Sequence, residues 1–143
     1  MDTNSELLTY IHVNSEMGKN MLNQLIGITK DNDFKSLLQS QYNEYNMINS
    51  ISEQKLSSRN KEAMNVNPFD KLAVYISINL NTLANAKPSH ISEILIKGST
   101  TGIIDITKKI NDYTSTADPE VLDLANRLLS FEQSNIEECK KYL

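Results

Sequence analysis

The sequence predicts an all-α fold, a bundle of four long helices that forms a single domain over residues 1–143. Four stretches of about 25 residues each carry apolar side chains at the spacing of an amphipathic helix. No stretch alternates with a period of two for long enough to form a sheet. The chain has only 4 glycines and 3 prolines, which leaves room for few turns, and 143 residues suffice to bury one core.

The first two helices are expected at residues 4–29 and 34–60, with a short polar turn between them. The apolar face of the first helix also contains Asn14 and Gly18, neither of which adds apolar surface. The apolar face of the second helix is interrupted by Gln41. Its apolar members recur at helical spacing and are Phe34, Leu38, Tyr45, Ile48 and Leu56.

A long connector, residues 61–87, separates the second and third long helices, and residues 69–86 within it have helical periodicity. A helix of about 18 residues is roughly 27 Å long, enough to run back along most of the bundle. The second and third long helices would then be parallel, which is the one-crossover, ferritin-like arrangement. Val74 and Ile78 lie opposite the main apolar face of this connector helix and predict self-association, most simply as a homodimer.

The third long helix is expected at residues 88–113, and it contains Gly98 and Gly102 on one face. A glycine within a helix costs roughly 1 kcal/mol relative to alanine, so the pair indicates close approach of another backbone or of a bound group. The last helix starts at Asp118, which is followed by a proline suited to a first turn. The residues of the last helix expected to face inward are Leu122, Ala125, Leu128, Leu129, Ile136 and Cys139.

Glu132 is the sharpest anomaly, because it lies near the middle of the apolar face of the last helix. A carboxylate buried there must find hydrogen-bond donors, take up a proton or bind a cation. In the crossover topology Glu132 is level with Gly18 and close to Ser99. Asn14 and Tyr45 are the expected donors to its carboxylate. The alternative, a bundle twisted so that Glu132 reaches water, stays open.

A resemblance to uncharacterised bacterial ferritin-like proteins rests on the helix lengths, the long crossover and the segments SHISEILIKGSTTGIIDITKKINDY and ADPEVLDLANRLLSFEQSNIEECKKYL. It covers most of the chain and implies a ferritin-like four-helix bundle. Di-metal members of that superfamily use a Glu on each of two helices and a Glu-x-x-His on each of the other two. The corresponding positions here are Glu44-x-x-Met47 and Glu132-x-x-Asn135, so the metal motif is not retained and neither metal nor cofactor is expected.

Other chemistry finds little support in the sequence. His12, with Glu16, is expected on the outer side of the first helix, and His90 is expected in the first turn of the third, so both are weak metal ligands. Cys139 is the only cysteine and is expected to be a small buried thiol. No P-loop or dinucleotide fingerprint is present, and a net charge of −4 argues against a general nucleic-acid binder.

Two functions remain open. The first is a non-enzymatic bundle that acts through self-association or through a protein partner. The second is a metal-binding or small-ligand-binding carboxylate protein, a relative of the di-iron oxidoreductases, for which Glu132, Asn14, Gln41 and the glycines are the support. The sequence shows no signal peptide and no apolar run of membrane-spanning length, so a cytoplasmic protein is expected.

Overall fold

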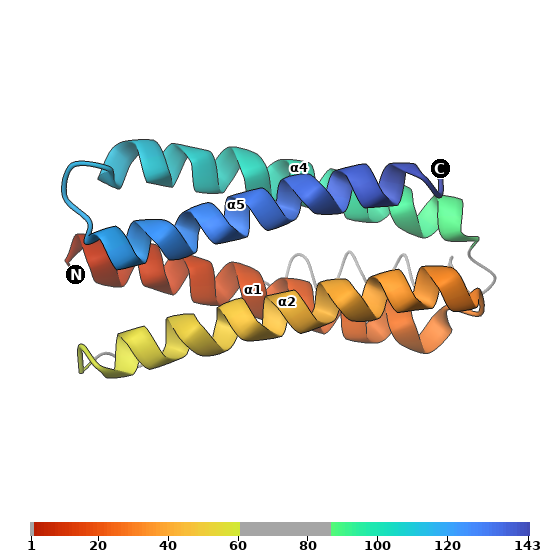
Figure 1. Cartoon of the computed structure of the whole chain (residues 1–143), viewed down its shortest axis with the longest axis horizontal. Helices are drawn as coiled ribbons and strands as arrows, with labels where there is room; N and C mark the ends of the chain where they lie inside the picture. Colours follow the sequence, from red (N-terminus) through yellow and green to blue (C-terminus); the bar gives the residue numbers. More distant parts are fainter. Residues whose placement is uncertain (1, 61–86) are drawn as a thin grey trace.

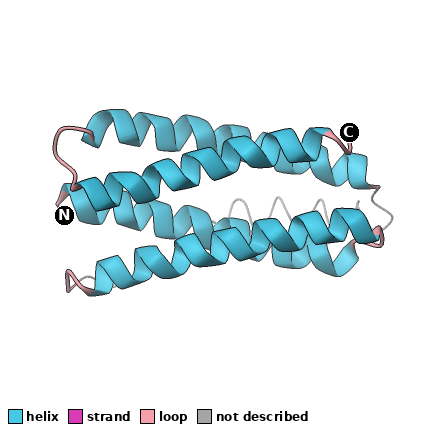
Figure 2. Cartoon of the chain, in the orientation of Figure 1, coloured by secondary structure: helices cyan, strands magenta, loops and turns pink. Residues whose placement is uncertain are grey.

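The computed structural model describes residues 2–60 and 87–143, and these residues form helices and no strand (Figure 2). The all-α prediction is confirmed for this part of the chain. The connector helix, with Val74 and Ile78, lies outside the described residues, so self-association through it stays a prediction. The four helices are α1 (Thr3–Ile28), α2 (Asn32–Ser57), α4 (Pro88–Tyr113) and α5 (Pro119–Lys140).

The helices begin in two ways. At the start of α2 the side chain of Asp31 accepts a hydrogen bond from the backbone N–H of Phe34 at 2.8 Å. Both α4 and α5 instead begin with a proline in the first turn, where the missing N–H would have no partner within the helix. The start at Asp118 is confirmed, but its side chain makes no capping hydrogen bond to α5 and pairs with Arg59.

Contacts at the two ends of the bundle define the helix directions. Arg59, just beyond α2, places its Nη2 3.3 Å from Oδ2 of Asp118 at the start of α5. At the other end, the ring of Phe34 near the start of α2 lies 4.8 Å from the ring of Tyr142, which follows α5. α2 is therefore antiparallel to α5. α4 is also antiparallel to α5, so α2 and α4 run in the same direction, as the sequence predicts (Figure 1).

The helices pack as two antiparallel hairpins, α1 with α2 and α4 with α5, and contacts between the hairpins are sparser than contacts within them. All five apolar residues predicted for the face of α2 are buried. The polar Gln41 is buried on that face with them. The core is thus continuous within each hairpin and thinner between the hairpins.

The buried face of α5 differs from the predicted one. Leu122, Leu129 and Ile136 were expected to face inward, but each is only half-buried. The fully buried positions include Ala125, Leu128 and Cys139 as predicted, and they are joined by Val121, Leu124, Glu132 and Asn135. The face is rotated relative to the prediction, because α5 packs against α4 on one side and contacts α1 and α2 on the other.

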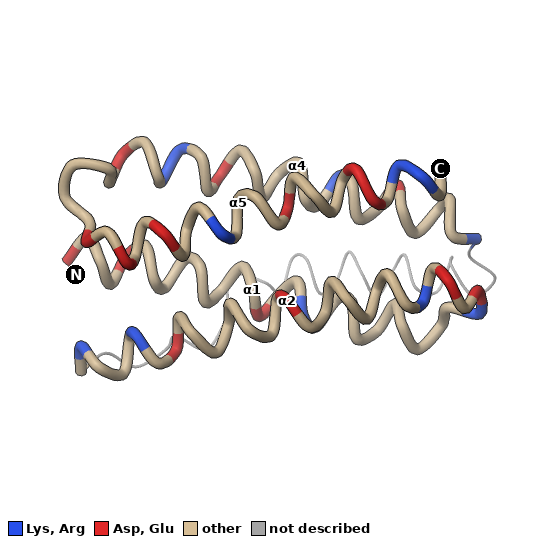
Figure 3. Tube along the Cα trace, viewed as in Figure 1, with Lys and Arg blue, Asp and Glu red and all other residues tan. Residues whose placement is uncertain are grey.

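Charged residues of both signs are interspersed along the described helices (Figure 3). No helix within residues 2–60 and 87–143 combines the length and the apolar character needed to cross a bilayer.

Candidate functional site

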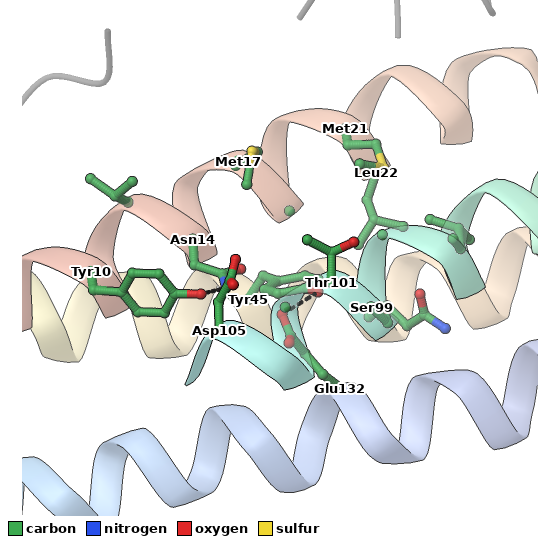
Figure 4. Close-up of a pocket in the computed structure, with 16 residues that line it drawn as sticks. Tyr10, Asn14, Met17, Met21, Leu22, Tyr45, Ser99, Thr101, Asp105 and Glu132 are labelled. Atoms are coloured by element: carbon green, nitrogen blue, oxygen red, sulfur yellow. Dashed lines mark hydrogen bonds between the residues drawn. The ribbon is translucent and has the colours of Figure 1, made fainter. Parts of the chain in front are cut away.

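A cavity of about 240 Å³ lies between α1 and α4, and all four helices contribute to its lining. Figure 4 shows side chains from α2 and α5 that point toward this space. All the site residues predicted from the sequence in the described part of the chain line it. They are the polar residues Glu132, Asn14, Gln41, Tyr45 and Ser99 and the glycines Gly18, Gly98 and Gly102.

The carboxyl group of Glu132 lies at the inner end of the cavity, and the side chain is only 2% exposed. Its Oε1 accepts a hydrogen bond from the Tyr45 hydroxyl at 3.4 Å (Figure 4). Its Oε2 is buried and has no hydrogen-bond partner among the described residues. The alternative in which Glu132 reaches water is therefore wrong, and half of the carboxyl group is unsatisfied.

Burial raises the pKa of Glu132 from 4.5 to about 8, because desolvation disfavours the charged carboxylate. Hydrogen bonding with Tyr45 and Asn14 opposes this rise in pKa, and the nearby negative charge of Asp105 adds to it. At neutral pH the carboxyl group therefore holds its proton in most molecules.

Two of the three predicted glycines lie directly against the ends of neighbouring side chains. A Cβ at Gly102 would overlap Oε2 of Glu132 and would lie 2.7 Å from Oε1. A Cβ at Gly18 would lie 2.6 Å from Cζ of the Tyr45 ring. Both distances are far shorter than real carbon contacts, so these positions make the room in which the carboxyl group and the phenol ring lie.

The close-packing prediction is wrong for Gly98. A Cβ there would meet nothing nearer than the methyl carbon of Met21, at 4.0 Å. Gly98 is exposed and lies at the edge of the cavity, where Thr101 and Asp105 are also exposed. The cavity therefore opens to solvent along this side of α4.

Tyr45 is held between the two hairpins. Its ring makes an edge-to-face contact with Phe131, with the ring centroids 4.7 Å apart. Burial and the negative charge of Glu132 raise the pKa of Tyr45, while hydrogen bonding with Ser99 and Asn135 lowers it. The phenol is thus a neutral donor that points at Glu132.

Asn14 and Gln41 each have a partner that the sequence did not predict. Asn14 was expected to donate to Glu132, and hydrogen bonding with Asn14 does lower the pKa of Glu132, but its Nδ2 also donates to the Tyr10 hydroxyl at 3.3 Å. Gln41 donates from Nε2 to the sulfur of Cys139 at 3.5 Å, deeper in the core. Cys139 is buried, as predicted.

A buried polar cluster between α1 and α2 was missed, and His12 was wrongly placed on the outer side of its helix. His12 is buried, with its Nδ1 3.4 Å from Nδ2 of Asn49 and 3.4 Å from Oγ of Ser52. Nδ2 of Asn49 also donates to the His12 carbonyl at 3.1 Å and to Ser15 Oγ at 3.3 Å. His90 is exposed, as expected.

Tyr10 and Asp105 were also not identified as site residues. Both line the cavity, and Figure 4 shows them beside Asn14. Tyr10 precedes Asn14 and Gly18 at steps of four residues, so helical spacing is a signal that could have identified it. Asp105 follows Gly98 and Gly102 at steps of seven and three residues, so its helical spacing from them is a signal that could have identified it.

The chemistry of the site is that of one deeply buried carboxyl group with an unpartnered oxygen in a largely apolar space. The described residues contain no group of three or more His, Cys, Asp or Glu side chains that could hold a metal ion. The charged residues among the described lining are Glu132 and Asp105, and no described lining residue is basic. The site can accept hydrogen bonds or face a positive charge.

Comparison of the chain with protein-family models, curated proteins and solved structures found no match. Its function must therefore be inferred from the geometry of the site itself.

Proposed function

We propose that this protein is a non-enzymatic small-molecule-binding bundle that holds its ligand in the cavity between α1 and α4. The observation that carries the proposal is the unpartnered Oε2 of Glu132, buried and facing that cavity. A buried polar atom without a partner costs about 1–3 kcal/mol, so its retention inside a bundle favours a role in binding. Gly102 supports the proposal, because it leaves the space that the carboxyl group occupies.

The size and the lining of the cavity support the same function. Apolar cavities of about 150 Å³ bind benzene, and this one measures about 240 Å³. Its apolar wall comes from both hairpins and consists of Val13, Met17, Met21, Leu22 and Leu95. A mostly apolar wall with a few convergent polar groups is typical of small-molecule sites.

A variant that fills the cavity tests the proposal. Gly98→Phe would place a ring at the cavity edge, where an added Cβ meets nothing nearer than the methyl carbon of Met21 at 4.0 Å. Gly27→Phe is the matched control, since a Cβ at Gly27 meets nothing within 4 Å and Gly27 does not line the cavity. The probes are 2-phenylethylamine and 2-phenylethanol, and binding is measured by isothermal titration calorimetry.

We expect saturable 1:1 binding of at least one probe to the wild type and to Gly27→Phe, and none to Gly98→Phe. Failure of both probes to bind, or equal binding by Gly98→Phe, would contradict the proposal. Metal analysis of protein purified without an affinity tag tests the alternative function. Stoichiometric iron or manganese would favour a metal-binding carboxylate protein instead.

We also infer that the bundle is of the ferritin-like kind. The support is the shared direction of α2 and α4 and the inward carboxyl group of Glu132, since ferritin-like bundles direct carboxylates into their core. The test is an experimental structure that includes residues 61–86. A helix that returns along the bundle over these residues is the expected result, and a connection of any other form would contradict the inference.

A further inference from the structure

We propose that the cavity selects a small organic cation, a primary ammonium group on a short apolar body. This inference rests on the proposed function and adds the chemical class of the ligand. The cavity has a carboxyl oxygen without a partner, Oε2 of Glu132, and a carboxylate, Asp105, at its exposed edge. A ligand that brings hydrogen-bond donors and a positive charge complements both groups.

The groups around Glu132 on the packed helices favour a cation over an anion. They are Tyr10 on α1, Tyr45 on α2 and Asp105 on α4. The tyrosines are neutral at physiological pH because burial raises the pKa of each, and Asp105 is negative. An anionic ligand would therefore meet two carboxyl groups and no described basic lining residue.

Once Glu132 has given up its proton, the hydrogen-bonding pattern favours a ligand that donates. Oε1 of Glu132 already accepts from Tyr45, so Oε2 is the atom left for a ligand. An ammonium group has three N–H donors. One can donate to Oε2 while the other two donate to the oxygen of Tyr10 or of Asn14. The ring of Tyr10, which lines the cavity, already has a cation over it, because Lys109 Nζ lies 5.1 Å from the ring centroid.

Binding of an ammonium ion changes the protonation of Glu132. The pKa of about 8 means that the empty site is largely protonated at pH 7. The ammonium ion keeps its own proton and pairs with the carboxylate, and the proton leaving Glu132 passes to the buffer. A neutral ligand would bind the protonated carboxyl group and release nothing.

The experiment compares 2-phenylethylammonium with 2-phenylethanol, which has the same apolar body without the charge. Calorimetric titrations at pH 7 in phosphate and in Tris, which differ in ionisation enthalpy, give the number of protons released per ligand. We expect the ammonium ion to bind at least about tenfold more tightly than the alcohol, because hydrogen bonds to charged groups are the stronger ones. We also expect release of close to one proton with the ammonium ion and none with the alcohol.

Glu132→Gln removes the charge and keeps the shape of the side chain. We expect it to weaken ammonium binding at least about tenfold and to abolish the proton release. An unchanged far-UV circular dichroism spectrum and a cooperative urea transition report that the variant is folded. If Glu132→Gln does not fold, the proton count on the wild type tests the same point.

Equal affinity of the wild type for the two probes, tighter binding of 3-phenylpropionate, or an ammonium preference that survives in Glu132→Gln would overturn the inference. In each of these cases the cavity still binds a ligand, so the proposed function stands. Failure of all probes to bind would overturn the proposed function and this inference with it.

Discussion

Glu132 can lie inside the bundle because position 102 of the facing helix has no side chain. The carboxyl group fills the space that a Cβ at Gly102 would take, and the ring of Tyr45 fills the corresponding space at Gly18. Two glycines on different helices thus shape one site. Alanine at either position would favour the helix more than glycine does. The glycines are therefore explained by the side chains that they accommodate.

Replacing Gly102 by alanine is expected to lower the free energy of unfolding by about 1–3 kcal/mol, because the new methyl group overlaps the Glu132 carboxyl group. Gly98→Ala is the matched control. It is expected to raise the free energy of unfolding by up to about 1 kcal/mol, since the position is open and alanine favours the helix. Urea denaturation measures both. The cost of Gly102→Ala should shrink in a Glu132→Ala background, and a cost that does not change there would show that the overlap is not its cause.

The buried carboxyl group also makes stability depend on pH. Because the pKa of Glu132 is 4.5 when unfolded and about 8 when folded, its contribution is fully present below pH 4.5 and is lost as pH rises to about 8. Glu132→Gln avoids this loss. Relative to the wild type, its free energy of unfolding should therefore rise by about 1.4 kcal/mol per pH unit between these limits and level off above them.

Urea denaturation of both proteins at pH 4.5, 6, 7.5 and 8.5 checks this prediction. The difference between them cancels the titration of the other acidic residues. A difference that is constant across the series would mean that Glu132 titrates normally in the folded protein.

At the scale of the helices, two buried polar positions differ in what they contribute. Asn49 lies between α1 and α2 and donates to the His12 carbonyl and to Ser15 Oγ, so it links the two helices of one hairpin. Ser92 on α4 is fully buried, and its hydroxyl has no partner among the described residues. The side-chain amide of Asn49 thus has hydrogen-bond partners, and the Ser92 hydroxyl has none among the described residues.

Asn49→Ala is expected to lower the free energy of unfolding by about 1–3 kcal/mol, because it removes these hydrogen bonds and leaves buried partners unsatisfied. Ser92→Ala is expected to leave it unchanged or to raise it by less than about 1 kcal/mol, since it removes a hydroxyl without a partner. Chemical denaturation of the two variants side by side checks the contrast. Equal losses in both would show that burial alone, and not hydrogen bonding, decides the cost.

The sequence predicts the helices well and their inward faces less well. Periodicity locates all four helices, and on α2 it identifies the buried face, from Phe34 to Leu56. Periodicity places His12 on the outer side of its helix, because its polar partners, Asn49 and Ser52, lie on another helix. It identifies Glu132 as anomalous but does not find the hydrogen bond from Asn14 to Tyr10, since side-chain direction depends on how the helices pack.

At the scale of the whole molecule, the cavity lies where the two hairpins meet, and contacts there are sparser than within each hairpin. Its lining comes from both hairpins. A molecule bound there would therefore contact the two halves of the fold at once and would add contacts where the bundle has fewest. Binding should stabilise the whole bundle, since the unfolded chain has no such cavity.

At a ligand concentration of 100 times Kd, the stabilisation is about 2.7 kcal/mol. For a chain of this length that corresponds to a rise in Tm of roughly 5–10 °C. Differential scanning calorimetry with 2-phenylethylammonium should show this rise for the wild type and for Gly27→Phe, and no rise for Gly98→Phe. A rise of the same size in Gly98→Phe would place the binding site elsewhere.

The open surroundings of Gly98 make this position a place for a chemical reporter. The chain's single native thiol, Cys139, is fully buried, so in the folded protein a thiol introduced by Gly98→Cys would be the one that reagents reach. An environment-sensitive dye coupled there would lie at the rim of the cavity, on the same face of α4 as Gly102. Because a group attached at position 98 takes the space that a ligand would need, its emission would report the polarity of the cavity itself.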